Sequence, residues 1–144
     1  MYKKILITTL LIILLISSCS SPKITYTPPP IEGDWSVRMI QTGGIAGVNR
    51  AVEVLSNGRY TVYQQAGGKG IKKQLSETDL AKLEELITNL EIANVQTDSI
   101  CADCFEYDIE IQSGGRKMVF QLNDMSLPDS GAGELVTFLQ SLFQ

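Results

Sequence analysis

Alternation of apolar and polar residues over 105–112 and 117–122, interrupted only at Val119, constrains the fold more than any other feature of the chain. The alternation continues on both sides of Gly114-Gly115, a dipeptide suited to a tight turn. Pairing the two arms across these glycines places apolar residues opposite each other: Tyr107 with Leu122, Ile109 with Phe120, and Ile111 with Met118. Because a slip of one residue would turn every apolar side chain to the other face, the pattern predicts one antiparallel hairpin in this register.

Period-two spacing also occurs earlier in the chain and predicts strands at 35–39, 49–56 and 59–65. A stretch expected to be flexible, 66–70, then leads into residues 71–75. Asn57-Gly58 separates the second and third of these strands and is typical of a type I′ hairpin turn, in which both central residues have positive φ.

Two segments instead carry the apolar spacing of a helix. One is residues 77–91, which begin directly after Ser76; Ser76 and Asp79 together form a capping-box signal. A second helix is expected to begin at Pro128 with Asp129 or Ser130, and residues 92–103 are expected to be irregular. The sequence therefore predicts one α+β domain over residues 32–144, with an antiparallel sheet of about five strands and two helices packed on one face.

The N-terminus has the pattern of an export signal. Lys3 and Lys4 precede the uncharged run Ile5–Ile16. A helix of that length spans about 18 Å, well short of the roughly 30 Å hydrocarbon core of a bilayer. We therefore expect residues 1–18 to be a cleaved signal peptide rather than a membrane-spanning anchor.

Ile16-Ser17-Ser18-Cys19 resembles a bacterial lipobox. The resemblance implies that Cys19 is lipidated and that the protein is anchored to the bilayer on the exported side of a bacterial cell envelope. Because Ser20 follows the cysteine, it also implies the outer membrane in a diderm bacterium. The alternative is an ordinary secretory signal with an unrelated cysteine. The proline-rich segment that follows, to residue 31, is expected to be a semi-rigid linker.

Composition excludes several classes of function. The chain has no histidine, which removes Ser-His-Asp and Cys-His nucleophile systems and every His-ligated metal site. Beyond residue 18 the net charge is about −6, which argues against nucleic-acid binding. We expect no catalytic residues, no cofactor and no metal.

Cys101 and Cys104 flank Ala102-Asp103. In an oxidising compartment three interpretations compete: a thioredoxin-like redox pair, a zinc site completed by carboxylates, or a local structural disulfide. A strand rather than a helix is expected to follow, and the sequence therefore favours the disulfide. The neighbouring acidic residues alternate along that strand and are expected to form a solvated face rather than a calcium site, because a straight strand splays its carboxylates: Glu106, Asp108 and Glu110.

Three glycines in five residues distinguish the loop made of Gly43, Gly44, Ile45, Ala46 and Gly47. Glycine permits positive φ and close approach of backbone to another group. Two interpretations remain open: a wide connection between strands, or a loop that holds Ile45 and Ala46 out for docking to a partner protein.

Several segments together resemble the emfourin family of small protein inhibitors of thermolysin-like zinc metalloproteases. They are "QTGGIAG", "LSETDLAKLEELITNL", "DCFEYDIEI", "SGGRKMVFQLND" and "LVTFLQSLFQ". The resemblance implies that Gly43, Gly44, Ala46 and Gly47 form the family's glycine loop. It also implies that Asp103, Phe105 and Tyr107 form the start of its aromatic strand, and that the domain acts by occluding a protease cleft. The alternative is a non-inhibitory envelope lipoprotein that serves as a protein-binding or structural module.

Overall fold

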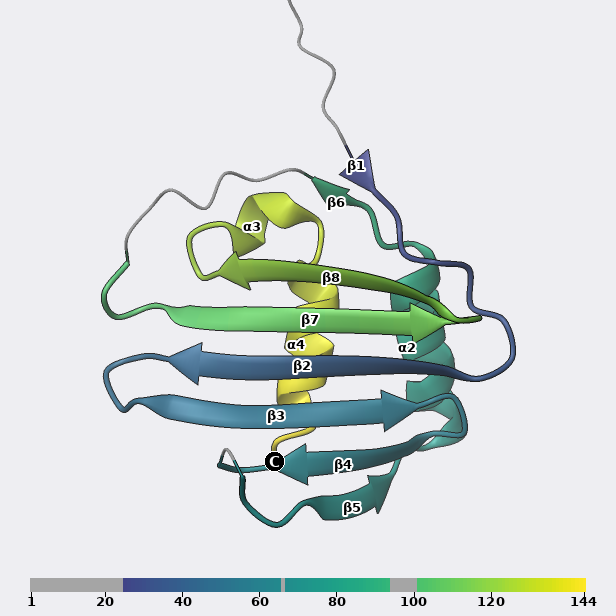
Figure 1. Cartoon of the computed structure of the whole chain (residues 1–144), viewed down its shortest axis with the longest axis horizontal. Coiled ribbons are helices and arrows are strands. Elements are labelled where there is room, and N and C mark those ends of the chain that lie inside the picture. Colours follow the sequence, from purple (N-terminus) through teal and green to yellow (C-terminus); the bar gives the residue numbers. More distant parts are fainter. Residues whose placement is uncertain (1–24, 66, 94–100) are drawn as a thin grey trace, which may run out of the picture.

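The computed structural model describes residues 25–65, 67–93 and 101–144, and it shows one large sheet with helices on one side (Figure 1). The strands are β1 (Thr25–Tyr26), β2 (Trp35–Gly43), β3 (Val48–Leu55), β4 (Arg59–Tyr63), β5 (Ile71–Gln74), β6 (Ile92–Ala93), β7 (Phe105–Ser113) and β8 (Arg116–Asn123). The helices are α2 (Glu77–Thr88), α3 (Leu127–Ser130) and α4 (Gly133–Ser141).

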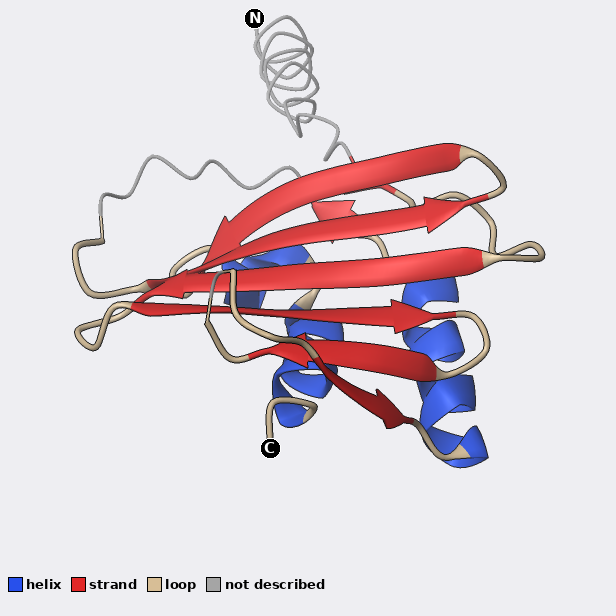
Figure 2. Ribbon diagram, turned by 60° about the horizontal axis from the view of Figure 1, so that its bottom comes forward, coloured by secondary structure: helices blue, strands red, loops and turns tan. Residues whose placement is uncertain are grey.

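The main sheet is antiparallel throughout, with strand order β5-β4-β3-β2-β7-β8. A separate two-stranded sheet joins β1 to β6. Figure 2 shows the helices together beneath one face of the large sheet, while no described helix covers the other face. The predicted α+β class and antiparallel pairing are confirmed, although the large sheet has six strands rather than about five and α3 is an additional short helix.

The core lies between the inner face of the sheet and the helices. Alternate residues of the central strands are fully buried, as are the facing residues of the two longer helices: Val37, Met39, Ile109, Leu83, Ile87, Leu135 and Leu139. Burying one such side chain contributes about 1.5–3 kcal/mol. All buried apolar residues of the described chain lie between 35 and 143. A fragment of residues 20–144 therefore keeps the entire described fold.

The two predicted hairpin turns differ in the number of residues that have positive φ. The β7–β8 hairpin has the predicted register, and both Gly114 and Gly115 have positive φ, as a type I′ turn requires. The type I′ prediction for Asn57-Gly58 is wrong, because only Gly58 has positive φ. The N–H of Gly58 donates to the carbonyl of Leu55 at 2.8 Å, which closes a three-residue loop that needs one left-handed residue at its end.

The helices end earlier than the apolar pattern indicates. The hydroxyl of Ser76 accepts the N–H of Asp79 and caps α2 as expected, but α2 ends at Thr88 rather than at residue 91. The predicted C-terminal helix is divided into α3 and α4 by Gly131, whose φ is +84°. A side chain at Gly131 would collide with the carbonyl oxygen of Glu91, the residue directly before β6. The break between α3 and α4 therefore requires glycine.

The described part of the expected linker lies against the domain. Besides the β1–β6 pairing, the Ser113 hydroxyl donates to the carbonyl of Pro30 at 2.8 Å and accepts the N–H of Glu32 at 3.0 Å. Ile31 packs on the core. The predicted signal peptide and Cys19 lie outside the described residues. Within the described ranges, every helix is too short or too polar to cross a bilayer.

Candidate functional site

The loop between β2 and β3 is a compact turn with an exposed tip. The N–H of Gly47 donates to the carbonyl of Gly44 at 3.0 Å, which places Ile45 and Ala46 at the turn centre. Ile45 is 91% exposed, more than any other large apolar residue of the described chain. Because nearly all of the Ile45 side chain stays in contact with water, it contributes little hydrophobic free energy to the stability of the fold.

Two glycines of this loop are required by packing as well as by backbone angle. Gly43 and Gly44 have φ of +94° and +68°. A side chain at Gly43 would collide with the backbone carbonyl of Cys104, and one at Gly44 would come within 2.6 Å of the Phe105 ring. The N–H of Gly44 also donates to the carbonyl of Cys104 at 3.0 Å. The glycine loop is therefore fastened to the segment that opens β7.

That segment carries the disulfide. Cys101 and Cys104 lie at disulfide distance, with 5.4 Å between their Cα atoms, as the sequence favoured. β7 begins directly after Cys104, so a strand rather than a helix follows the cysteine pair. The structure thus brings together two features that are about 60 residues apart in the sequence: the glycine loop and the cysteine pair.

Asp124 holds the start of β7 in place, and the sequence analysis missed it. Its carboxylate accepts the N–H of Phe105 at 2.8 Å and the hydroxyl proton of Tyr107 at 2.7 Å. The side chain of Gln140 donates to the same Tyr107 oxygen at 3.2 Å. Burial, followed by the contact with Asp124, raises the pKa of Tyr107 to about 12. Tyr107 therefore keeps its proton at neutral pH, and its hydroxyl donates a hydrogen bond that holds the strand to Asp124.

A second polar contact lies beneath the loop. Gln41 is 1% exposed, and its side-chain oxygen accepts two N–H groups of Arg50, at 2.9 and 3.1 Å. The Arg50 guanidinium lies 4.1 Å from the centre of the Phe143 ring, which is a cation–π contact. Gln41 pairs with Arg50 on one side and with Tyr107 on the other. The one signal for this contact in the sequence is a glutamine at an inward position of the alternating strand β2.

The loop end of the sheet carries a second exposed apolar residue. Met125, two residues after the end of β8, is 60% exposed. Figure 1 shows that the β2–β3 loop, the start of β7 and the end of β8 lie at the same end of the sheet. This end therefore presents Ile45 and Met125 on a framework braced by Asp124, the disulfide and the Gln41–Arg50 contact.

The acidic residues of β7 take no part in this framework. Glu106, Asp108 and Glu110 alternate with the buried residues of the strand and so lie on the uncovered face. Glu110 forms an ion pair with Lys117 at 3.1 Å. In residues 25–65, 67–93 and 101–144, no three acidic or cysteine side chains converge in a way that could hold a metal ion.

Comparison of the chain with known protein families and with curated proteins gave no match. The function is therefore argued from the loop end of the sheet itself.

Proposed function

We propose that this chain is an exported, lipid-anchored protein-binding domain that inserts the tip of the Gly43–Gly47 loop into a cleft of its partner. The observation that carries the proposal is the 91% exposure of Ile45 on a loop fastened to its neighbours. A loop that is already ordered loses little conformational entropy on binding. Burying the Ile45 side chain in an apolar cleft contributes about 2 kcal/mol.

A thermolysin-like zinc metalloprotease is the partner implied by the resemblance to the emfourin family. Inhibition by occlusion needs a rigid convex element and no chemistry on the inhibitor. The fastening of Gly44 to Cys104, together with the two bonds from Asp124, supports such an element. Met125 adds apolar surface at the same end of the sheet.

The lipid anchor rests on the sequence around Cys19. With two or more acyl chains, membrane attachment is stable, whereas a single chain holds only marginally. The test is intact-mass analysis of the full chain expressed with its leader in a bacterium. A mass that begins at Cys19 and includes acyl groups supports the anchor, and Cys19→Ala should release the protein from membranes. A mature protein with an unmodified Cys19, or with the leader retained, refutes it.

The cleft-binding proposal is tested with the soluble fragment of residues 20–144. The fragment is added to several thermolysin-like proteases, and peptide hydrolysis is measured. Ile45→Asn should weaken inhibition at least tenfold, because it removes about 2 kcal/mol of apolar contact. The matched control is Ile71→Asn, since Ile71 is also an exposed isoleucine, 49% exposed on β5.

The possible outcomes separate the inhibitor from the alternative. Inhibition that depends on Ile45 supports the proposed function. Unchanged hydrolysis by all the proteases at micromolar fragment refutes inhibition. In that case, crosslinking from membranes to an exported protein, lost in Ile45→Asn and kept in Ile71→Asn, would support a non-inhibitory binding module.

A further inference from the structure

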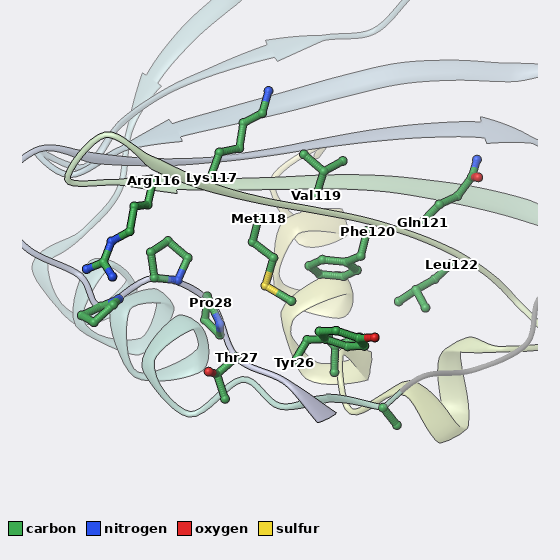
Figure 3. Close-up of a pocket in the computed structure, with 14 residues that line it drawn as sticks. Tyr26, Thr27, Pro28, Arg116, Lys117, Met118, Val119, Phe120, Gln121 and Leu122 are labelled. Atoms are coloured by element: carbon green, nitrogen blue, oxygen red, sulfur yellow. The ribbon is translucent and has the colours of Figure 1, made fainter. Parts of the chain in front are cut away.

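A groove of about 720 Å³ runs along β8, between this strand and the N-terminal segment of the described chain (Figure 3). Figure 3 shows Met118, Phe120 and Leu122 pointing from β8 toward Tyr26 and Thr27. Ile92 and Ala93 of β6 complete the apolar part of the lining. The groove therefore has one wall made of a strand and another made of an extended segment.

The strand wall offers unpaired backbone groups. β8 is an edge strand of the large sheet. The N–H of Asp124 donates to the carbonyl of Phe105, so the even-numbered residues of β8 direct their backbone groups toward β7. Lys117, Val119 and Gln121 consequently direct theirs outward, where none forms a backbone hydrogen bond with a described residue.

The opposite wall does not complete the sheet. It includes Pro28, Pro29 and Pro30, and proline has no backbone N–H to donate. Tyr26 pairs with Ile92 of β6, and the carbonyl of Pro30 accepts the hydroxyl proton of Ser113, at the end of β7. The groove thus remains open along a strand edge, with room for another chain.

The charged residues that line the groove indicate which kind of ligand it would bind. Its charged lining residues are Arg116 and Lys117, with no acidic residue, although the chain as a whole has a net charge of −4. Lys117 is already paired with Glu110, whereas the guanidinium of Arg116 forms no ion pair with the described residues. An acidic group on the occupant would therefore be favoured beside Arg116.

We propose that this groove binds an extended peptide segment of a partner protein by strand addition to β8. The peptide pairs with the backbone of Lys117, Val119 and Gln121, which span about five residues of strand. Its alternate side chains face the apolar lining, and an acidic residue lies beside Arg116. A fatty acyl chain fits less well, because it would cover the outward N–H and C=O groups of β8 without bonding them.

The test uses a phage-displayed library of random nine-residue peptides, selected on the 20–144 fragment. Enriched peptides are synthesised and titrated into ¹⁵N-labelled fragment, and amide shifts are followed by NMR. We expect alternating apolar residues with Asp or Glu near one end, and shifts concentrated in Arg116–Leu122. Methylating the backbone nitrogens that face β8 should abolish binding, because it removes the donors of the added strand.

Variants test the orientation of the peptide. Arg116→Gln should weaken binding of the acidic peptides about two- to fivefold, as expected for an exposed charge pair. The matched control is Arg59→Gln, which removes an exposed arginine of β4 that does not line the groove and should leave binding unchanged. Ile45→Asn should also leave it unchanged, since this groove is distinct from the loop tip.

Several results would overturn the proposal. These are the absence of enriched peptides that shift β8 amides, N-methylated peptides that bind equally well, or equal affinity of Arg116→Gln for acidic peptides. Saturation of the same amides by sodium palmitate, with no effect of peptides, would assign the groove to an acyl chain. Shifts that arise from protein concentration alone, with a dimer in sedimentation, would assign it to a second copy.

Discussion

Gly43→Ala is the sharpest test of how the glycine loop is held. Gly43 has a φ of +94°, and a methyl group there would collide with the backbone carbonyl of Cys104, which no side-chain rotation can relieve. The left-handed backbone costs about 1–2 kcal/mol for a residue with a side chain. Forcing atoms into a packed region adds about 1–3 kcal/mol.

The matched control is Gly47→Ala in the same loop. Gly47 has a φ of +61°, but nothing lies within 4 Å of a methyl group added there. Its substitution should therefore cost only the backbone contribution, about 1–2 kcal/mol. The difference between the two variants isolates the contact with Cys104, which we expect to be about 1–3 kcal/mol.

Urea unfolding of the 20–144 fragment measures both variants, with fluorescence of Trp35, the single tryptophan, as the signal. Trp35 is buried on β2, so its emission reports loss of the core. The midpoint should fall further for Gly43→Ala than for Gly47→Ala at an unchanged slope. Equal losses in the two variants, within about 0.5 kcal/mol, would show that the loop is not fastened to the disulfide segment.

Three further predictions concern the surrounding framework. Replacing Cys101 and Cys104 together by serine should lower the free energy of unfolding by about 2 kcal/mol, the loop-closure value for a four-residue ring, measured by urea unfolding. The pKa of Tyr107 is about 12 in the folded protein and about 10 in the unfolded chain, so its contribution to the free energy of unfolding is fully present below pH 10 and is lost as the pH rises toward 12. Tyr107→Phe should therefore reduce the fall in the free energy of unfolding between pH 10 and pH 12, measured by urea unfolding. Deleting residues 25–31 should lower the melting temperature relative to the 20–144 fragment, because it removes β1 and the Pro30 acceptor of the Ser113 hydroxyl.

Local sequence patterns predicted strands and their register correctly where the alternation of apolar and polar residues allows only one pairing. The β7–β8 register follows from alternation around two glycines, since a slip by one residue would reverse both faces. The type I′ prediction for Asn57-Gly58 was wrong because the same dipeptide fits both a two-residue and a three-residue loop. The length depends on how β3 and β4 align, and the observed register places buried Val52 opposite buried Val62, a pairing that the dipeptide does not encode.

The candidate site could not be predicted in the same way, because it depends on pairing between distant segments. Gly43 lies beside Phe105 only because β2 pairs with β7, and no local signal specifies that neighbour. Asp124 follows a strand and resembles any polar turn residue in the sequence. Its role depends on β8 ending beside the start of β7. The proline-rich segment was expected to be a linker, since composition alone does not reveal the bonds from Ser113.

β8 keeps the two proposed surfaces apart and makes them separately testable. The loop end is braced through Asp124, whereas the groove has its charge at Arg116, eight residues earlier on the same extended strand. At 3.3 Å per residue this separation is about 26 Å. The groove continues along β8 to Leu122, but Arg116 opens β8 at the end of the sheet opposite the β2–β3 loop that carries Ile45. Substitutions at Arg116 and Ile45 should therefore contribute independently to binding and stability. If each surface acts as proposed, Arg116→Gln weakens binding of acidic peptides and leaves the function of the loop tip intact, whereas Ile45→Asn does the reverse. Loss of both functions in either single variant would instead mean that the domain has one binding face.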